Sequence, residues 1–285
     1  GLPLLQILKN LSQEVEDPAL QETLPEIVKR IENGASFSES LREYPHIFSR
    51  LFVNLANAGE ISGQQDVVLH QLTTYLEEEH EFRQSLKSAL AYPIFVIGFS
   101  VLAVAALVLF IIPIFQDIFA QFDAELPVMT QIVIDISDFV RSHFLLVIFG
   151  IVGAVVGFMV GKRTDQGKRI LDALALKIPI FGPLVEKTML ARISRTFSVL
   201  VGNGITVINS LNIVKEIIEN IHYHDLLEEA AHDIQEGLTI AKALRKSGRL
   251  PSMLIQMIDA GEESGNLEKM LEKAAEFYEK QVRAI

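Results

Sequence analysis

Residues 94–112 read IFVIGFSVLAVAALVLFII, an uncharged run of nineteen residues that lies between Pro93 and Pro113. With a rise of about 1.5 Å per residue, an α-helix of this length spans about 28 Å, close to the ~30 Å hydrocarbon core of a bilayer. The uncharged sequence continues beyond both prolines. The run therefore predicts a transmembrane helix, which we place at residues 89–115.

A second uncharged run occupies residues 144–161 and reads FLLVIFGIVGAVVGFMVG, again long enough to cross a bilayer. Its four glycines recur at three- and four-residue spacing, which gives a small-residue face suited to close packing against another helix. A buried core helix is the alternative interpretation of both runs, but their complete lack of charge favours the membrane. Neither run is N-terminal, which excludes a signal peptide.

The flanking cations predict the orientation of the two spans. Lysine and arginine gather before the first span and after the second, whereas the connector at residues 116–143 carries mostly acids. Because cations near span ends stay on the cytoplasmic side, we expect both large polar regions inside and the connector in the periplasm. The flanking cations are Arg83, Lys87, Lys162, Arg163, Lys168, Arg169 and Lys177.

The two polar regions repeat one another. Residues 31–41 align with residues 234–244, and the pattern Ala-Gly-Glu-x-Ser-Gly follows at residues 58–63 and again at residues 260–265. Matches that recur in the same order over about 80 residues indicate a duplicated domain.

Each copy is predicted to be helical, because apolar residues recur at three- and four-residue spacing and no useful run alternates as a strand would. Gly34 and Gly237 are expected at helix ends, with Ser36 and Thr239 as N-caps of the short helices that follow. The predicted fold is an all-α membrane protein, in which two cytoplasmic antiparallel bundles of about six helices each are joined by two transmembrane helices.

Comparison of the copies also predicts missing pieces. The first copy lacks an N-terminal helix that the second has, and the second lacks a further transmembrane helix. The predicted organisation is a first cytoplasmic domain at residues 1–88, transmembrane helices at 89–115 and 144–161 around the periplasmic connector at 116–143, and a second cytoplasmic domain at 162–285.

The repeated Ala-Gly-Glu-x-Ser-Gly motif is interpreted first as a connection between helices. We expect Gly59 and Gly261 to take positive φ at a helix end, and Ser62 and Ser264 to cap the next helix. Ser62 with Gln65 also fits a capping box, a feature that the second motif lacks.

The alternative interpretation is that Glu60 and Glu262 contact a partner or a hard divalent cation, although a lone carboxylate could not hold such an ion. The candidate partner-contact or turn residues are Gly59, Glu60, Ser62, Gly63, Gly261, Glu262, Ser264 and Gly265.

The composition excludes several functions. With 36 acidic and 25 basic residues the net charge is −11, which argues against nucleic-acid binding. The absence of cysteine excludes disulfides, thiolate metal sites and cysteine nucleophiles. Neither a P-loop nor a zinc-protease, nucleophile-elbow or dinucleotide motif occurs, so we predict no catalytic or cofactor-binding residues, and any use of ATP must come from a partner.

One helix face carries His224, Glu228 and His232 at four-residue steps. The two histidines would lie about 12 Å apart along the helix axis by their ~1.5 Å rise, too far to share one ion. The first copy has other residue types at these positions. We therefore predict a solvated face and no metal site.

Three blocks of sequence resemble the GspF/PilC family, the inner-membrane platform proteins of type II secretion and type IV pilus machines. They are SALAYPIFVIGFS at residues 88–100, IIPIFQDIFAQFDAELPVMTQ at 111–131, and IPIFGPLVEKTMLARISRTFSVLVGNGI at 178–205. The resemblance covers nearly the whole chain, and the segment FDAELP at residues 122–127 is more similar to the pilus branch.

The resemblance implies a multi-pass protein of the bacterial inner membrane that couples a cytoplasmic assembly ATPase to the polymerisation of pilins or pseudopilins. Other implied partners are further inner-membrane assembly proteins, the lipid bilayer and further copies of the same chain. We expect no enzymatic activity. A transporter or channel subunit is the alternative, but such proteins usually carry ionisable groups inside their spans, and here both are uncharged.

Overall fold

The computed structural model describes residues 4–121, 164–179 and 181–284, together with single positions between residues 131 and 161. All regular secondary structure in these residues is helical, which confirms the all-α class. Contacts divide the chain into two compact units. One combines Gly1–Arg83 with Leu176–Ile285, and the other is Gln84–Ala175.

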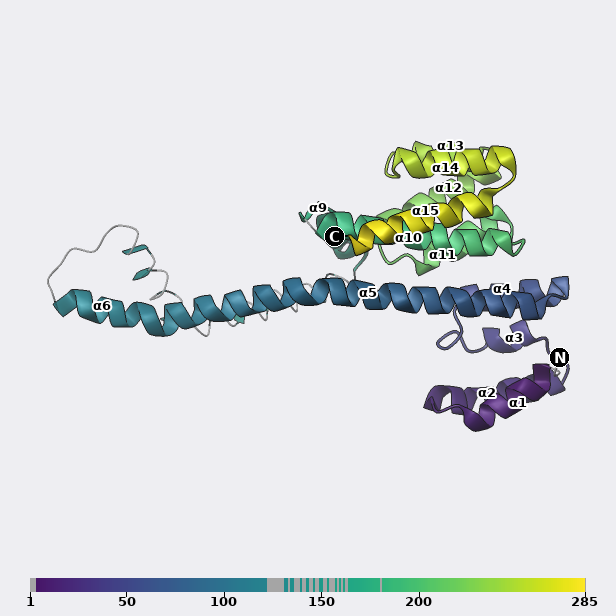
Figure 1. Ribbon diagram of the computed structural model, residues 1–285, viewed down its shortest axis with the longest axis horizontal. Coiled ribbons are helices and arrows are strands. Elements are labelled where there is room, and N and C mark those ends of the chain that lie inside the picture. The colour runs from purple at the N-terminus through teal and green to yellow at the C-terminus, as the bar shows by residue number, and fades with distance from the viewer. Residues whose placement is uncertain are drawn as a thin grey trace. The chain divides into compact units, whose positions relative to one another are not determined.

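The first unit begins with four helices, drawn in purple to blue in Figure 1. Asp17 caps α2, because its carboxylate accepts from Ala19 N at 2.9 Å and Leu20 N at 3.1 Å. Gly34 has φ 96° beyond the end of this helix, and Ser36 caps α3 with a capping box, as the sequence predicts. The helices are α1 (Leu4–Glu14), α2 (Pro18–Glu32), α3 (Phe37–Arg42) and α4 (Arg50–Ser62).

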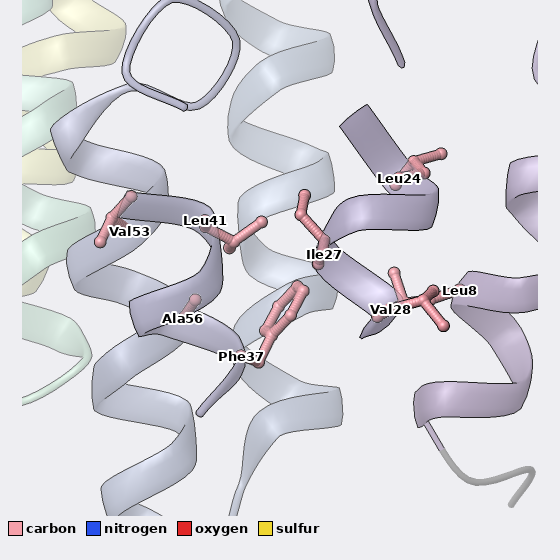
Figure 2. Packing of buried hydrophobic residues seen from close by; sticks show 8 residues of the cluster. All are labelled: Leu8, Leu24, Ile27, Val28, Phe37, Leu41, Val53 and Ala56. Carbon is pink, nitrogen blue, oxygen red and sulfur yellow. The ribbon is translucent and has the colours of Figure 1, made fainter. Parts of the chain in front are cut away.

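These four helices share an apolar core. Figure 2 shows Phe37 and Leu41 of α3 directed toward Ile27 and Val28 of α2. Ile27 is fully buried, and burial of such a side chain stabilises the fold by about 1.5–3 kcal/mol. The core cluster consists of Leu8, Leu24, Ile27, Val28, Phe37, Leu41, Val53 and Ala56.

The same unit contains six further helices, green to yellow in Figure 1. Asn220 caps α12 through His222 N at 3.0 Å, and Thr239 caps α13 as predicted, while Gly237 has φ 100° between these helices. Helix α10 packs along α15. The bounds are α10 (Phe181–Gly202), α11 (Val207–Ile217), α12 (Ile221–Gln235), α13 (Ile240–Lys246), α14 (Ser252–Ser264) and α15 (Leu267–Arg283).

A long helix carries the first uncharged run. Helix α5 (Gln65–Ala106) continues through a π-helical turn, η1 (Leu107–Ile111), into α6 (Ile112–Gln121). The π turn ends two residues before Pro113, whose backbone nitrogen carries no hydrogen to donate.

The buried side chains of α5 lie in its first part, at Val68, Leu72, Tyr75 and Phe82. By length and composition, the helix Gln65–Phe115 could cross a membrane, because it contains a window of 18 residues with a mean hydropathy of 3.0, none of them buried. It is the one such helix in the part of the chain that the structure describes.

The second predicted span, at residues 144–161, lies largely outside the described residues, as does the connector at residues 116–143. The number of spans and the domain boundaries therefore stay predictions. Beyond the second uncharged run, the chain forms helix α9 (Asp165–Lys177).

Candidate functional site

The two repeated motifs lie at the ends of α4 and α14. Gly59 and Gly261 are inside these helices, whereas Gly63 and Gly265 follow them as left-handed caps, each with φ 69°. The prediction of positive φ at Gly59 and Gly261 is therefore wrong. Each helix continues for one more turn, and the glycine that ends the motif takes the left-handed conformation that favours this residue type.

The first glycine of each motif allows a close approach between consecutive helices. A Cβ atom on Gly261 would lie 2.9 Å from Leu267 Cα and 3.1 Å from Met270 Cβ. The same atom on Gly59 would lie 3.1 Å from Gln65 Cα. Since van der Waals contact between carbons is near 3.5–4.0 Å, only glycine fits without displacing the following helix.

The serines of the motifs do not cap the next helix. The Ser62 hydroxyl donates to the Ala58 carbonyl at 2.8 Å, and the Ser264 hydroxyl donates to the Ala260 carbonyl at 2.6 Å. Both serines belong to the last turn of the preceding helix, so their hydroxyls bond backward within it. The capping-box prediction for Ser62 and Gln65 is wrong for the same reason.

The carboxylate of Glu60 holds the start of α3. It accepts hydrogen bonds from Phe37 N at 2.5 Å and Ser38 N at 3.1 Å, and a third from the Ser38 hydroxyl. A carboxylate at a helix N-terminus satisfies backbone donors that the helix leaves unpaired and interacts favourably with the helix dipole. Glu60 therefore fastens α4 to α3.

Glu262 makes the corresponding contact in the second motif. Its two oxygens accept from Ile240 N at 2.9 Å and Ala241 N at 3.2 Å, at the start of α13. We call these two contacts the carboxylate clamps. The hydrogen bonds of the clamps already use the carboxylate oxygens. They therefore explain why both motifs contain glutamate, and a bound cation is not needed for that explanation. A role for the motifs in contacting a partner stays a prediction.

A second polar arrangement, which sequence reasoning missed, joins α5 to α10 and α15. Arg192 of α10 donates to Glu79 of α5 at 2.9 Å, and Arg195 donates to Glu279 of α15 with both Nε and Nη2 at 3.1 Å. Arg195 also lies 3.4 Å from Glu78. We call these five residues the charged cluster.

The charged cluster is mostly shielded from water. The side chains of Arg192 and Arg195 are only 12% and 15% exposed, so their ion pairs lie in surroundings of lower polarity than the surface. Burial raises the pKa of Glu78, which precedes the uncharged run, while the Arg195 charge opposes this effect. Nearby, Tyr75 and Thr196 share a buried hydrogen bond of 3.0 Å between the same two helices, α5 and α10.

Beside the cluster lies an open hollow of about 190 Å³. Acidic and neutral polar side chains dominate its lining, and we assign no ligand to it. The lining residues are Gln71, Thr74, Tyr75, Glu78, Arg195, Ser198, Val199, Gly202, Asn203, Glu268 and Glu272.

The helix face with His224, Glu228 and His232 does not form one site. Among the described residues, the ligand atoms fall into two separate groups, one around each histidine. Lys215 donates to Glu228 at 3.0 Å, and this hydrogen bond lowers the pKa of that exposed carboxyl. In the other group, Lys246 donates to both oxygens of Asp233. Lysine thus occupies carboxylate oxygens in both groups.

Among protein families, the chain matches type II secretion system (T2SS) protein F over residues 1–113 and 193–284.

Curated relatives match over almost the full chain. The type IV pilus assembly protein PilC of Thermus thermophilus is 37% identical over 283 residues, which cover 99% of this chain and 70% of the relative. PilC of Myxococcus xanthus is 34% identical over 284 residues, covering 100% and 68%. The type II secretion system protein F of Pseudomonas aeruginosa is 30% identical over 284 residues, covering 100% and 70%.

Proposed function

Because the chain belongs to the type II secretion system protein F family, we propose that it is an inner-membrane assembly platform of a type IV pilus or type II secretion machine. The observation that carries the proposal is similarity along the whole chain to relatives named for these two machines. The pilus branch is favoured, because the two pilus proteins described above are 34% and 37% identical and the secretion protein 30%.

The proposed platform crosses the membrane at residues 89–115 and 144–161, with both polar regions in the cytoplasm. The exposed apolar surface of α5 supports the first span. Its outer positions include Phe95, Phe99 and Leu102, which are 64–70% exposed and would be costly to leave in water.

We further propose that residues 4–82 and 207–281 are two copies of one helical domain. The helices correspond in order and size, with fifteen residues each in α2 and α12 and thirteen each in α4 and α14. The carboxylate clamps support the same proposal, since each joins a thirteen-residue helix to the short helix before it. The family match over two separate ranges supports it independently.

The platform acts as an adaptor in this proposal and has no catalytic role. The sequence lacks a P-loop, so the energy of assembly must come from a separate cytoplasmic ATPase. In this proposal the cytoplasmic domains bind the ATPase, and the transmembrane helices contact pilins or pseudopilins within the bilayer.

Deletion of the gene tests this function in a strain that has both machines. We expect loss of surface pili, with unassembled pilin retained in the membrane, and restoration by the full-length gene. Loss of type II secretion with normal pili would assign the chain to the secretion branch. If both piliation and secretion are normal, the platform proposal fails.

Single cysteines test the topology, because these 285 residues contain none. We expect Ala124→Cys to react with a membrane-impermeant thiol reagent in intact cells, and Ser12→Cys and Ser247→Cys to react only after permeabilisation. Reaction of Ser247→Cys in intact cells would contradict the proposed orientation. The permeabilised sample controls for burial of the thiol.

A further inference from the structure

The charged cluster joins helices that belong to different copies of the repeated domain. Helices α5 and α15 correspond to one another, because each directly follows an Ala-Gly-Glu-x-Ser-Gly motif. Helix α10 packs along α15 of its own copy and also reaches α5 of the first copy, where Arg192 pairs with Glu79. Given the proposed duplication, the cluster is therefore a contact between the two copies.

One face of α5 carries this contact. Tyr75, Glu79 and Phe82 recur at four- and three-residue spacing, which places them on one side of the helix. Tyr75 and Phe82 are buried, and the Glu79 side chain is only 17% exposed. Tyr75 hydrogen bonds to Thr196 and Glu79 to Arg192, so the contacts follow α5 and α10 in opposite directions. The two helices thus lie antiparallel along this face.

The acids of this face are not shared by the two copies. Counted from the motifs, Glu78 and Glu79 of α5 correspond to Lys280 and Gln281 of α15. Lys280 is exposed to water, in contrast to Glu79. Because the second copy forms its helix without acids at these positions, the domain fold does not require them. Their role is the contact with α10.

Charge gives this contact a fixed register. Arg192 and Arg195 supply the positive charges from α10, and glutamates of α5 and α15 supply the negative ones. These pairs are mostly shielded from water, so a displacement of α5 along α10 would leave a shielded charge without its partner. Such an unpaired charge is costly, whereas an apolar contact would tolerate sliding more easily.

We propose that the charged cluster is a mechanical joint, which fixes the second cytoplasmic domain to the cytoplasmic end of the first transmembrane helix. Helix α5 continues from Glu79 as one helix to Ala106, and so into the proposed first span. A displacement of α10 therefore moves that span with it. This inference rests on the proposed platform function and deepens it, because a partner bound to the second domain acts through the joint on a helix within the bilayer.

Exchange of charges in the full-length protein tests the joint. Arg192→Glu places an acid opposite Glu79, and adding Glu79→Arg restores a pair of opposite charges. Each variant also carries Thr74→Cys and Val199→Cys, which line the hollow from α5 and α10 and are bridged by a short bis-maleimide. We expect bridging in native membranes to fall several-fold with Arg192→Glu, because like charges repel, and to recover in the exchanged pair.

Filament assembly or secretion is measured with the same charge variants, without the added cysteines. We expect Arg192→Glu to abolish whichever process the wild-type gene restores in a deletion strain, and the exchanged pair to regain it. Glu216→Arg is the matched control. Its pair with Arg50 also connects the two copies, but 74% of the arginine side chain is exposed, so bridging and assembly should stay at the wild-type level.

The outcomes separate the joint from the platform function. Unchanged bridging with Arg192→Glu would overturn the joint, and so would normal assembly once bridging is lost. If Arg192→Glu fails to fold, Glu79→Gln decides, because it removes one charge and keeps the side-chain size; wild-type bridging and assembly in that variant would also overturn the joint. A wild-type gene that restores neither pili nor secretion would overturn the platform itself, whatever the bridging shows.

Discussion

Replacement of Gly261 with alanine is expected to destabilise the protein by about 1–3 kcal/mol, the usual cost of overpacking a well-packed contact. The new Cβ atom would lie 2.9 Å from Leu267 Cα, a backbone atom that cannot rotate away. Helices α14 and α15 would have to separate. Thermal unfolding of the purified chain in detergent micelles, followed by limited proteolysis at α14 and α15, measures the effect.

A loss of stability would indicate overpacking, because alanine normally stabilises a helix by about 0.5–1 kcal/mol relative to glycine. Gly98→Ala is the matched control, since Gly98 is also helical and a Cβ atom there meets nothing within 4 Å. Gly59→Ala should have the smaller effect of the two motif variants, because its closest backbone distance is 3.1 Å. A Gly261→Ala protein as stable as Gly98→Ala would show that the close crossing is not required.

Loss of a carboxylate clamp should lower the stability of the protein about as much as Gly261→Ala does. Glu262→Ala leaves Ile240 N and Ala241 N without their charged acceptor, and hydrogen bonds to charged groups contribute about 1.5–3 kcal/mol. Helix α13 should then fray, with faster amide hydrogen exchange over residues 240–246. Glu262→Gln keeps an acceptor oxygen but loses the charge, so its effect should be intermediate.

Glu263→Ala is the matched control, because Glu263 is the adjacent residue in the same helix and is exposed. Glu60→Ala should loosen α3 in the same way. Hydrogen exchange in α13 equal to that of the Glu263→Ala control would contradict the structural role of the clamp. Loss of filament assembly by Glu262→Gln with unchanged stability would instead support the partner-contact role.

The sequence predicts those parts of this fold that depend on neighbouring residues. The N-caps Ser36 and Thr239, and the helix-ending glycines Gly34 and Gly237, are confirmed, because a cap and its donors lie within a few residues of one another. The all-helical class follows from the spacing of apolar residues, which is also a local signal.

Contacts between distant residues were not predictable in this way. Each motif contains two glycines, and the choice of which one ends the helix depends on how closely the next helix packs. Glu60 bonds to backbone 22 and 23 residues earlier, and Arg192 pairs with a glutamate 113 residues away. The sequence offered one signal for the charged cluster: Arg192 and Arg195 lie three residues apart in the mostly buried helix α10.

The shielding of the charged cluster also determines how the protein should respond to ionic strength. At physiological salt the Debye length is about 8 Å, and mobile ions weaken pairs in water far more than pairs they cannot surround. The pair between Arg50 and Glu216, with 74% of the arginine side chain exposed, should therefore be screened. The pairs of Arg192 with Glu79 and of Arg195 with Glu279 should persist, so α5 and α15 should stay joined to α10 as the salt concentration rises.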